Sequence, residues 1–213
     1  MLLRKKIRIM IDQLKNLLGT RLTSVWVNDE SAKVLSPYGQ GVRFCEAVHL
    51  SFNHPIKLIS ENVICPGARR SLGFYRNDKD LAQFISGNNA IPIEFIEGAL
   101  EEIPKLSQIG SVILGMDREN EQARNPDLLI AYVKPEVITR IMHQLAREKR
   151  KARISPFSLL SVCGNVFANC YLNNRISVSF GCPESRRYGG VENDEVIIGI
   201  PYSEVHLLAC SAG

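Results

Sequence analysis

The spacing of apolar residues changes several times along the chain, and each change predicts a new helix or strand. Helices are expected where apolar residues recur every three to four positions, and strands where short β-branched runs are bounded by polar residues or glycine. The predicted helices cover residues 2–18, 42–52, 80–85, 91–103 and 157–170, and further helices start at Cys65, near Pro135, at Cys182 and at Pro201. The predicted strands cover residues 22–27, 56–59, 111–116, 127–133, 175–180 and 195–200. Because helices and strands mix without a regular strand–helix–strand rhythm, the expected fold class is α+β.

A motif that occurs twice suggests that the chain is internally duplicated. Cys-Pro-x-x-Arg-Arg stands at residues 65–70 and again at residues 182–187. A further cysteine precedes each copy, Cys45 by 20 residues and Cys163 by 19 residues. In both copies the end of a helix, an Asn-containing turn and a strand separate the two cysteines. Each copy therefore supplies one cysteine within a helix and one at the start of the next helix.

The similarity between the two copies extends beyond the cysteines. The Ile-Pro at residues 91–92, which begins a predicted helix, resembles the Ile-Pro at residues 200–201. We therefore expect one compact domain, residues 1–213, made of two similar halves of about 1–108 and 109–213. Two copies in one chain usually pack as two subunits would, about a pseudo-twofold axis. Such an axis would bring the two pairs of cysteines together.

The cysteine of each Cys-Pro pair is suited to metal binding. Pro66 and Pro183 fit the first turn of a helix, where a missing N–H group is not needed. Cys65 and Cys182 would then lie at helix N-termini, close to unpaired N–H groups and the positive end of the helix dipole. This environment is expected to lower the thiol pKa and to favour thiolate, the form that binds metal.

Four cysteines on four separate elements suit a [4Fe–4S] cluster better than a single zinc ion. Structural zinc sites usually have ligands paired as Cys-x(2–4)-Cys, and this spacing is absent, as is the close spacing of ferredoxin ligands. The predicted ligands are Cys45, Cys65, Cys163 and Cys182. With a thiolate on every iron, we expect electron transfer or another redox role with a partner protein. Zinc, a redox dithiol and buried structural thiols are the alternatives.

The arginines of the two motifs allow a second function. Arg69, Arg70, Arg186 and Arg187 add positive charge beside the predicted helix N-termini. Near a cluster, this charge would stabilise the negative thiolates and raise the reduction potential. Without metal, the same helix N-termini and arginine pairs would bind an anionic small molecule or cofactor. No Ser-His-Asp arrangement, phosphate-binding loop or dinucleotide-binding glycine motif is recognisable, so the sequence identifies no enzymatic reaction.

Three further residues lie near or outside the cysteine pattern. Cys170 follows Cys163 by seven residues, on the same predicted helix face. We expect it to pack in the core, with a role as substitute ligand as the alternative. Cys210 is expected to be a core residue. His49 lies one turn after Cys45, and we expect a histidine satisfied by hydrogen bonds rather than a metal ligand.

Composition and charge restrict the partners and the compartment. The chain has 213 residues, 45% of them hydrophobic and 23% charged, which is typical of a globular protein. The net charge of +4 is mild. The basic run at residues 147–153 ends a predicted helix, where cations suit the dipole, so no nucleic-acid partner is expected. Charges interrupt the apolar N-terminus, so we expect neither signal peptide nor membrane span, and a cytoplasmic protein with reduced thiols. The sequence leaves open whether the chain forms a homo-oligomer.

These motifs together resemble the uncharacterised family called domain of unknown function 169, common in archaea and anaerobic bacteria. The matching segments, spread over nearly the whole chain, are RFCEAV around Cys45, CPGARRSLGF from Cys65, NPDLLIAYVKPE from Asn125, SVCGNV around Cys163, SVSFGCPESR before Arg187 and IGIPYSEV near the C-terminus. The resemblance implies an intracellular, cysteine-dependent protein of anaerobes. It implies no particular reaction, and Cys170 is not part of the family pattern.

Overall fold

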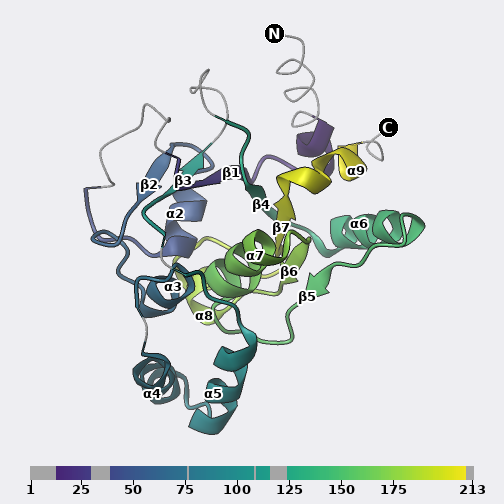
Figure 1. Cartoon of the computed structure of the whole chain (residues 1–213). Helices are drawn as coiled ribbons and strands as arrows, with labels where there is room; N and C mark the ends of the chain where they lie inside the picture. The colour runs from purple at the N-terminus through teal and green to yellow at the C-terminus, as the bar shows by residue number, and fades with distance from the viewer. Residues whose placement is uncertain (1–12, 30–38, 76, 108, 116–123, 210–213) are drawn as a thin grey trace.

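The computed structural model describes residues 13–29, 39–75, 77–107, 109–115 and 124–209. A seven-stranded sheet with the order β2-β3-β1-β4-β7-β6-β5 forms its centre (Figure 1). The strands are β1 (Leu22–Val27), β2 (Ile56–Leu58), β3 (Val112–Gly115), β4 (Leu128–Val133), β5 (Arg153–Ile154), β6 (Ser177–Ser179) and β7 (Val196–Pro201). Neighbouring strands are antiparallel except for β5 and β6, which are parallel. With its helices and mixed sheet, the chain has the predicted α+β fold.

Helices cover both faces of the sheet. Every residue of β1, β4 and β7 is buried, and alternate side chains enter two separate hydrophobic cores. The first core lies under α2 (Phe44–Leu50), α3 (Pro66–Ser71), the π-helix η1 (Ser161–Ala168) and α7 (Asn169–Asn173). The second core lies under the helical residues 13–18, α6 (Pro135–Arg147) and α9 (Val205–Ala209), which follows the 3-10 turn η2 (Tyr202–Glu204).

Two helices extend away from this layered body. α4 (Asp78–Asn89) and α5 (Ile93–Glu102) pack against each other as a hairpin between α3 and β3, and the hairpin projects from one end of the molecule (Figure 1). α4 begins with the side chain of Asn77 accepting from the backbone N–H of Asp80 at 3.4 Å, and it ends at Ala90 in the left-handed conformation. The short helix α8 (Pro183–Arg187) packs on α2.

The strand order is similar on both sides of the central β1–β4 pair. β1 is followed outward by β3 and then β2, and β4 is followed outward by β7, β6 and the additional edge strand β5. From β1 the chain passes through α2 to β2 and through α3 to β3. From β4 it first forms α6 and β5, and then passes through η1 and α7 to β6 and through α8 to β7. In this comparison α2 corresponds to η1 with α7, and α3 corresponds to α8. The hairpin α4–α5 has no helical counterpart between α8 and β7, a segment that is wholly described.

The π-helix lies close to the sheet because β7 carries a glycine beneath it. A Cβ built at Gly199 would stand 2.8 Å from Cγ1 of Val166 and 3.2 Å from Cβ of Cys170. Both separations are shorter than ordinary contacts, so a larger residue at position 199 would force the helix outward. The glycine therefore fixes the depth at which η1 packs on the sheet.

Two predicted helices begin later than expected, and one strand was not predicted. The helix expected over residues 157–170 begins at Ser161, because Leu160 has the left-handed backbone conformation, with φ 47°. Pro201 ends β7 instead of beginning the last helix. β5 was not predicted, since it is a two-residue edge strand with no apolar run of its own. Of the helix predicted over residues 2–18, only residues 13–18 lie within the described part of the chain, and they are helical.

Among the described residues, none of the helices combines the length and the apolar character that crossing a bilayer requires.

Candidate functional site

Four cysteines that are far apart in the sequence line one cavity. Cys45 comes from α2, Cys65 from the residue before α3, Cys163 from η1 and Cys182 from the residue before α8. The cavity has a volume of about 170 Å³. These are the four residues singled out by the sequence as metal ligands, and the structure brings all of them together around one space. Whether they hold a metal stays a prediction.

The helices that carry the cysteines are packed directly against one another. η1 contacts both α2 and α3, and α8 contacts α2. At the last of these contacts the Cys45 thiol donates to the carbonyl oxygen of Glu184 at 3.8 Å. Behind α2, the hydroxyl of the buried Tyr132 donates to the carbonyl oxygen of Cys45 at 3.4 Å. The cavity walls are therefore held by contacts between helices that belong to the two groups of strands flanking the central β1–β4 pair.

Burial raises the pKa of the thiols of Cys45, Cys65 and Cys163. The pKa of Cys45 is raised far above its usual range, first by burial and then by the nearby Cys182 and Cys65. The pKa of Cys163 is likewise raised by burial and by the other three cysteines. The pKa of Cys65 is raised by burial, although the backbone N–H groups of Ala68 and Gly67 act in the opposite direction. The sequence-based expectation of a lowered pKa at Cys65 is wrong, because the apolar surroundings outweigh the helix N-terminus.

Hydrogen-bond donors nevertheless surround the sulfur atoms. The N–H groups of Ala68 and Gly67 favour the charged form of Cys65, and the hydroxyl of Ser71 favours the charged form of Cys163. α8 starts with a capping box in which the backbone N–H of Ser185 donates to the side chain of Cys182. Donors of this kind stabilise thiolates once a cation has replaced their protons.

The side chains of the described residues form no ready-made metal site. A tetrahedral zinc site requires four ligand atoms about 2.3 Å or less from one centre. Within the described residues, no group of three or more His, Cys, Asp or Glu side chains is arranged to hold a metal ion.

The four arginines predicted to bind a cofactor make their contacts elsewhere. Arg69 donates to the carbonyl oxygens of Ser60 at 2.7 Å and Val63 at 3.2 Å. Arg186 donates to the carbonyl oxygens of Phe180 at 2.6 Å and of Glu192. Arg187 lies 5.2 Å from the ring centre of Tyr188. These three arginines contact backbone carbonyl groups of loops or the ring of Tyr188, and none of them lines the cavity.

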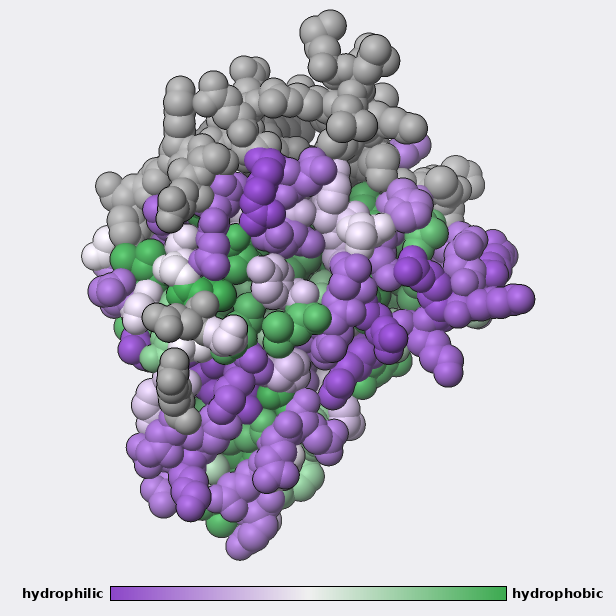
Figure 2. Space-filling model, viewed as in Figure 1, coloured by the Kyte–Doolittle hydropathy of each residue, from purple (hydrophilic) through white to green (hydrophobic). Residues whose placement is uncertain are grey.

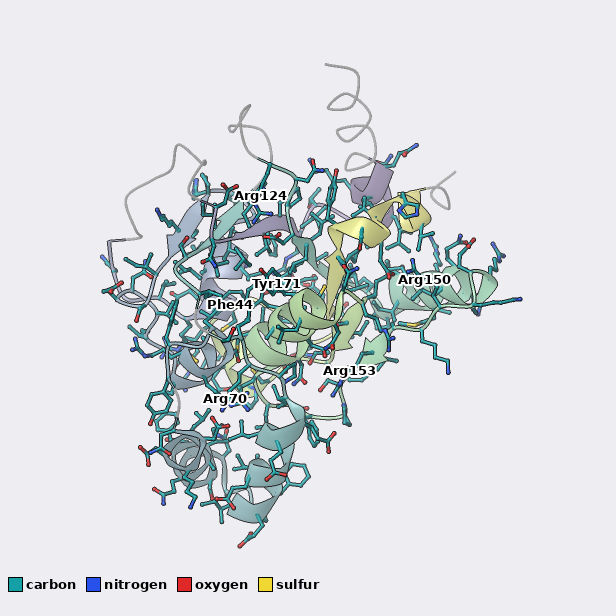
Figure 3. The ribbon with its side chains drawn as sticks, in the orientation of Figure 1. Phe44, Arg70, Arg124, Arg150, Arg153 and Tyr171 are labelled. Carbon is teal, nitrogen blue, oxygen red and sulfur yellow. The ribbon has the colours of Figure 1, made fainter. Side chains whose placement is uncertain are left out.

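Arg70, the fourth arginine, joins α3 to the α4–α5 hairpin. Its guanidinium is 2% exposed and forms an ion pair with Asp78, with Nε 3.1 Å from Oδ1. It also donates to the carbonyl oxygens of Ile103 at 2.9 Å and Leu100 at 2.5 Å. Figure 3 places it at the junction between the body and the hairpin. All these hydrogen bonds are to protein groups, which indicates a structural role.

The additional candidates lie away from the cavity. Cys170 is fully buried against Gly199 of β7 and does not line the cavity, as expected for a packing residue. The ring of His49 packs against Gly190 and, edge-on, against Phe52. The Nδ1 atom of His49 is buried without a hydrogen-bond partner, so the expected satisfied histidine is not observed at this atom. Cys210 lies outside the described residues.

Sequence reasoning missed the other wall of the cavity. Leu81, Phe84 and Ile85 of α4 line it together with the cysteines, and Ser161 of η1 lines it as well. The run DLAQFI predicts an amphipathic helix, but nothing in the sequence indicates that this helix packs over the cysteines. Ser161 lies two residues before Cys163, and its type and spacing match no metal or catalytic motif.

Comparison with known proteins identifies relatives without an assigned activity. The sequence model of the family DUF169, described as "Uncharacterised ArCR, COG2043", matches residues 23–209. "Uncharacterized protein MJ0308" from Methanocaldococcus jannaschii is 24% identical over 168 residues, which cover 75% of this chain and 71% of that protein. No solved structure matches the chain.

Proposed function

The chain belongs to the DUF169 family, and we propose that it binds a [4Fe–4S] cluster through Cys45, Cys65, Cys163 and Cys182. The observation that carries this proposal is the position of the four thiols around one cavity. The four thiols could supply one ligand to each of the four iron corners of a cuboidal cluster. The bound cluster would supply one-electron redox chemistry.

The character of the cavity fits such a group. Its volume of about 170 Å³ is similar to that of cavities near 150 Å³ that hold benzene. Apart from the cysteines, most of its lining is apolar, which would shield the cluster from water and adjust its reduction potential. The donors near Cys65 and Cys163 would stabilise the thiolates. Iron would displace the thiol protons, so binding at this site would release protons.

Electron transfer is the role that this set of ligands favours. Four thiolates leave no open iron for a substrate, and the cavity reaches the surface where the exposed residues Phe84, Ser158 and Pro183 line it. A redox partner could therefore approach the cluster from this side. Free thiols at all five described cysteines are consistent with the cytoplasmic location that we propose.

We further propose that the two sides of the sheet arose by internal duplication. The matching strand orders β1-β3-β2 and β4-β7-β6 support this, as do the matching contacts of α3 with η1 and of α8 with α2. In this scheme the halves divide between β3 and β4, and not near residue 108. The suggested match between residues 91–92 and 200–201 is not supported, since the first pair precedes α5 and the second ends β7.

The test is anaerobic purification followed by a visible spectrum and a count of iron and acid-labile sulfide per chain. The proposal predicts a brown protein with about four of each. A folded, colourless protein that takes up no iron on reconstitution would overturn it. One zinc per chain would favour a structural zinc protein. Loss of a bound anion on replacement of Arg69 and Arg186 in an iron-free protein would favour the anion-binding alternative.

A further inference from the structure

A second hollow in the protein surface lies where α6 and α7 end. Its volume is about 350 Å³, and it shares no lining residue with the cysteine cavity. Lys149, Arg150 and Lys151 line it from the turn after α6, and Arg175 lines it from the turn between α7 and β6. We call it the basic hollow after these four residues. In Figure 2 hydrophilic side chains cover α6, the helix that leads into it.

The pairing of β5 with β6 explains why cations from two different turns meet at the basic hollow. The two strands are parallel, with Arg153 opposite Ser177. Lys151 and Arg175 each stand two residues before this pair, and both line the hollow. The fourth cation therefore does not belong to the basic run at residues 147–153, and the fold adds it to that run.

The turn that carries the other three cations has a fixed backbone. Lys149 has the left-handed conformation, and its N–H donates to the carbonyl oxygen of Ala146 at 3.0 Å. The N–H of Arg150 donates to the carbonyl oxygen of Leu145 at 2.8 Å. These two bonds form a Schellman motif, which closes the end of α6. A fixed backbone lowers the entropic cost of binding a ligand at this turn.

The charge of the basic hollow is only partly neutralised within the protein. Glu204 is the one acidic side chain among its described lining residues, and it is 4% exposed. Its Oε1 lies 3.4 Å from Nη2 of Arg150. Lys149, Lys151 and Arg175 form no ion pair with any side chain in the described part of the chain. Four cations therefore share one carboxylate.

The ends of α6 and α7 account for some of this positive charge. A helix C-terminus is equivalent to about −0.5 elementary charge, so cations are favourable there without any ligand. Two helix ends and one carboxylate offset about two of the four positive charges, and about two remain. This excess lines a hollow together with Asn173 and Asn174, whose amide groups can donate and accept hydrogen bonds.

We propose that the basic hollow binds the phosphate group of a small polar molecule. A phosphate monoester carries a charge of about −1.5 to −2 at pH 7, which matches the remaining positive charge. Arg175 would bind its oxygens through the guanidinium fork, and Lys151 would add a point charge. The volume lies within the range of small-molecule sites, about 300–1,000 Å³, so a polar organic part would fit beside the phosphate and contact the two asparagines.

The test uses glycerol 3-phosphate, inorganic phosphate and glycerol as probes. Their dissociation constants are measured by calorimetry at constant pH and ionic strength on the anaerobically purified chain. We expect glycerol 3-phosphate to bind more tightly than inorganic phosphate, and glycerol not to bind. Arg175→Gln should weaken binding of glycerol 3-phosphate about tenfold, because it removes charge-assisted hydrogen bonds.

Arg140→Gln is the matched control. Arg140 is an exposed arginine of α6 that does not line the basic hollow, so the same change in charge there should alter the affinity less than about twofold. Both substitutions replace exposed side chains, and denaturant unfolding should show that both variants keep the stability of the parent chain.

Each other outcome counts against the proposal. Absence of binding by both phosphate probes, or equal losses in Arg175→Gln and Arg140→Gln, would overturn the site. Equal affinity for glycerol 3-phosphate and inorganic phosphate would overturn the organic part of the ligand. Tight binding of a DNA duplex that both substitutions weaken alike would assign the charge to a nucleic-acid surface instead. The iron content of the chain enters none of these outcomes, so this proposal and the cluster proposal can fail separately.

Discussion

Gly189 and Cys45 lie against each other where the end of α8 meets α2. A Cβ built at Gly189 would stand 2.8 Å from the Cβ of Cys45 and 2.7 Å from the carbonyl oxygen of Ser185. The absence of a side chain at position 189 therefore allows the second Cys-Pro helix to approach the first cysteine. This contact joins a helix connected to the β1 group of strands, α2, with a helix connected to the β4 group, α8.

The substitution Gly189→Ala should separate α8 from α2. We expect a loss of about 1–3 kcal/mol in the free energy of unfolding, because backbone and a Cβ would have to move. If the cluster proposal holds, iron per chain should fall as well. The measurements are denaturant unfolding of the metal-free chain and iron analysis after anaerobic purification.

Gly98→Ala provides the matched control for this substitution. Gly98 is an exposed residue inside α5, and a Cβ there would meet nothing within 4 Å. Alanine should stabilise this position by about 0.5–1 kcal/mol. If Gly189→Ala proved as harmless as Gly98→Ala, the close contact with Cys45 would not matter for the fold.

The metal-free chain should lose stability in alkali. The cavity thiols Cys45, Cys65 and Cys163 have a pKa raised above the ordinary value of 9.0, chiefly by burial. Their contribution to the free energy of unfolding is fully present below pH 9, because these thiols are then protonated in both the folded and the unfolded chain. Above pH 9 the unfolded chain releases protons that the folded chain keeps, so unfolding becomes more favourable. Each such thiol contributes a slope that approaches about 1.4 kcal/mol per pH unit.

Guanidinium unfolding of the reduced, metal-free chain at about pH 8, 9 and 10 would measure how the free energy of unfolding changes with pH. Cys163→Ala should reduce the loss of stability between about pH 9 and 10 by about 1 kcal/mol, since one buried thiol is removed and the unfolded thiol is only partly ionised in this range. Equal stability at all three values would mean that the thiols ionise in the folded chain as readily as in the unfolded one.

Replacing Arg70 should destabilise the hairpin junction. Arg70→Met would leave the carbonyl oxygens of Leu100 and Ile103 without their donor and remove one partner of Asp78. Unsatisfied buried polar groups cost about 1–3 kcal/mol each, so a loss of about 3 kcal/mol or more is expected. The measurement is the free energy of unfolding of the metal-free chain.

Lys105→Met tests the other partner of the same carboxylate. Nζ of Lys105 lies 2.9 Å from Oδ2 of Asp78, but the lysine side chain is 44% exposed. An exposed ion pair contributes about 0–1 kcal/mol, so this variant should be far milder. Similar losses in the two variants would contradict the role of Arg70 as a buried donor to the backbone.

The strands were the most predictable part of the fold. β1 has the predicted bounds, β4 begins one residue later than predicted, and β7 begins and ends one residue later than predicted. All three are uninterrupted runs of mainly apolar residues buried on both faces, so sequence and burial indicate the same element. The start of η1 could not be predicted, because it depends on the left-handed backbone of Leu160, a residue type that rarely adopts it.

The candidate site was predictable only in part. The repeated Cys-Pro motif predicted that Cys65 and Cys182 lie at one site with Cys45 and Cys163, the cysteines that precede them. The raised pKa of Cys65 could not be predicted, since a helix N-terminus is visible in the sequence but the burial of the thiol is not. The partnerless hydroxyl of Ser161 depends on what surrounds it in three dimensions, which no local pattern records.

The most direct test of the cluster proposal compares two cysteines carried by consecutive helices. Cys163 lines the cavity, whereas Cys170, equally buried, packs against β7. Iron and sulfide per chain are measured in Cys163→Ser and Cys170→Ser after anaerobic purification. The account predicts that Cys163→Ser loses a large share of the iron, while Cys170→Ser keeps about four irons per chain. Equal iron in both variants, or loss of iron only in Cys170→Ser, would contradict a cluster held in this cavity.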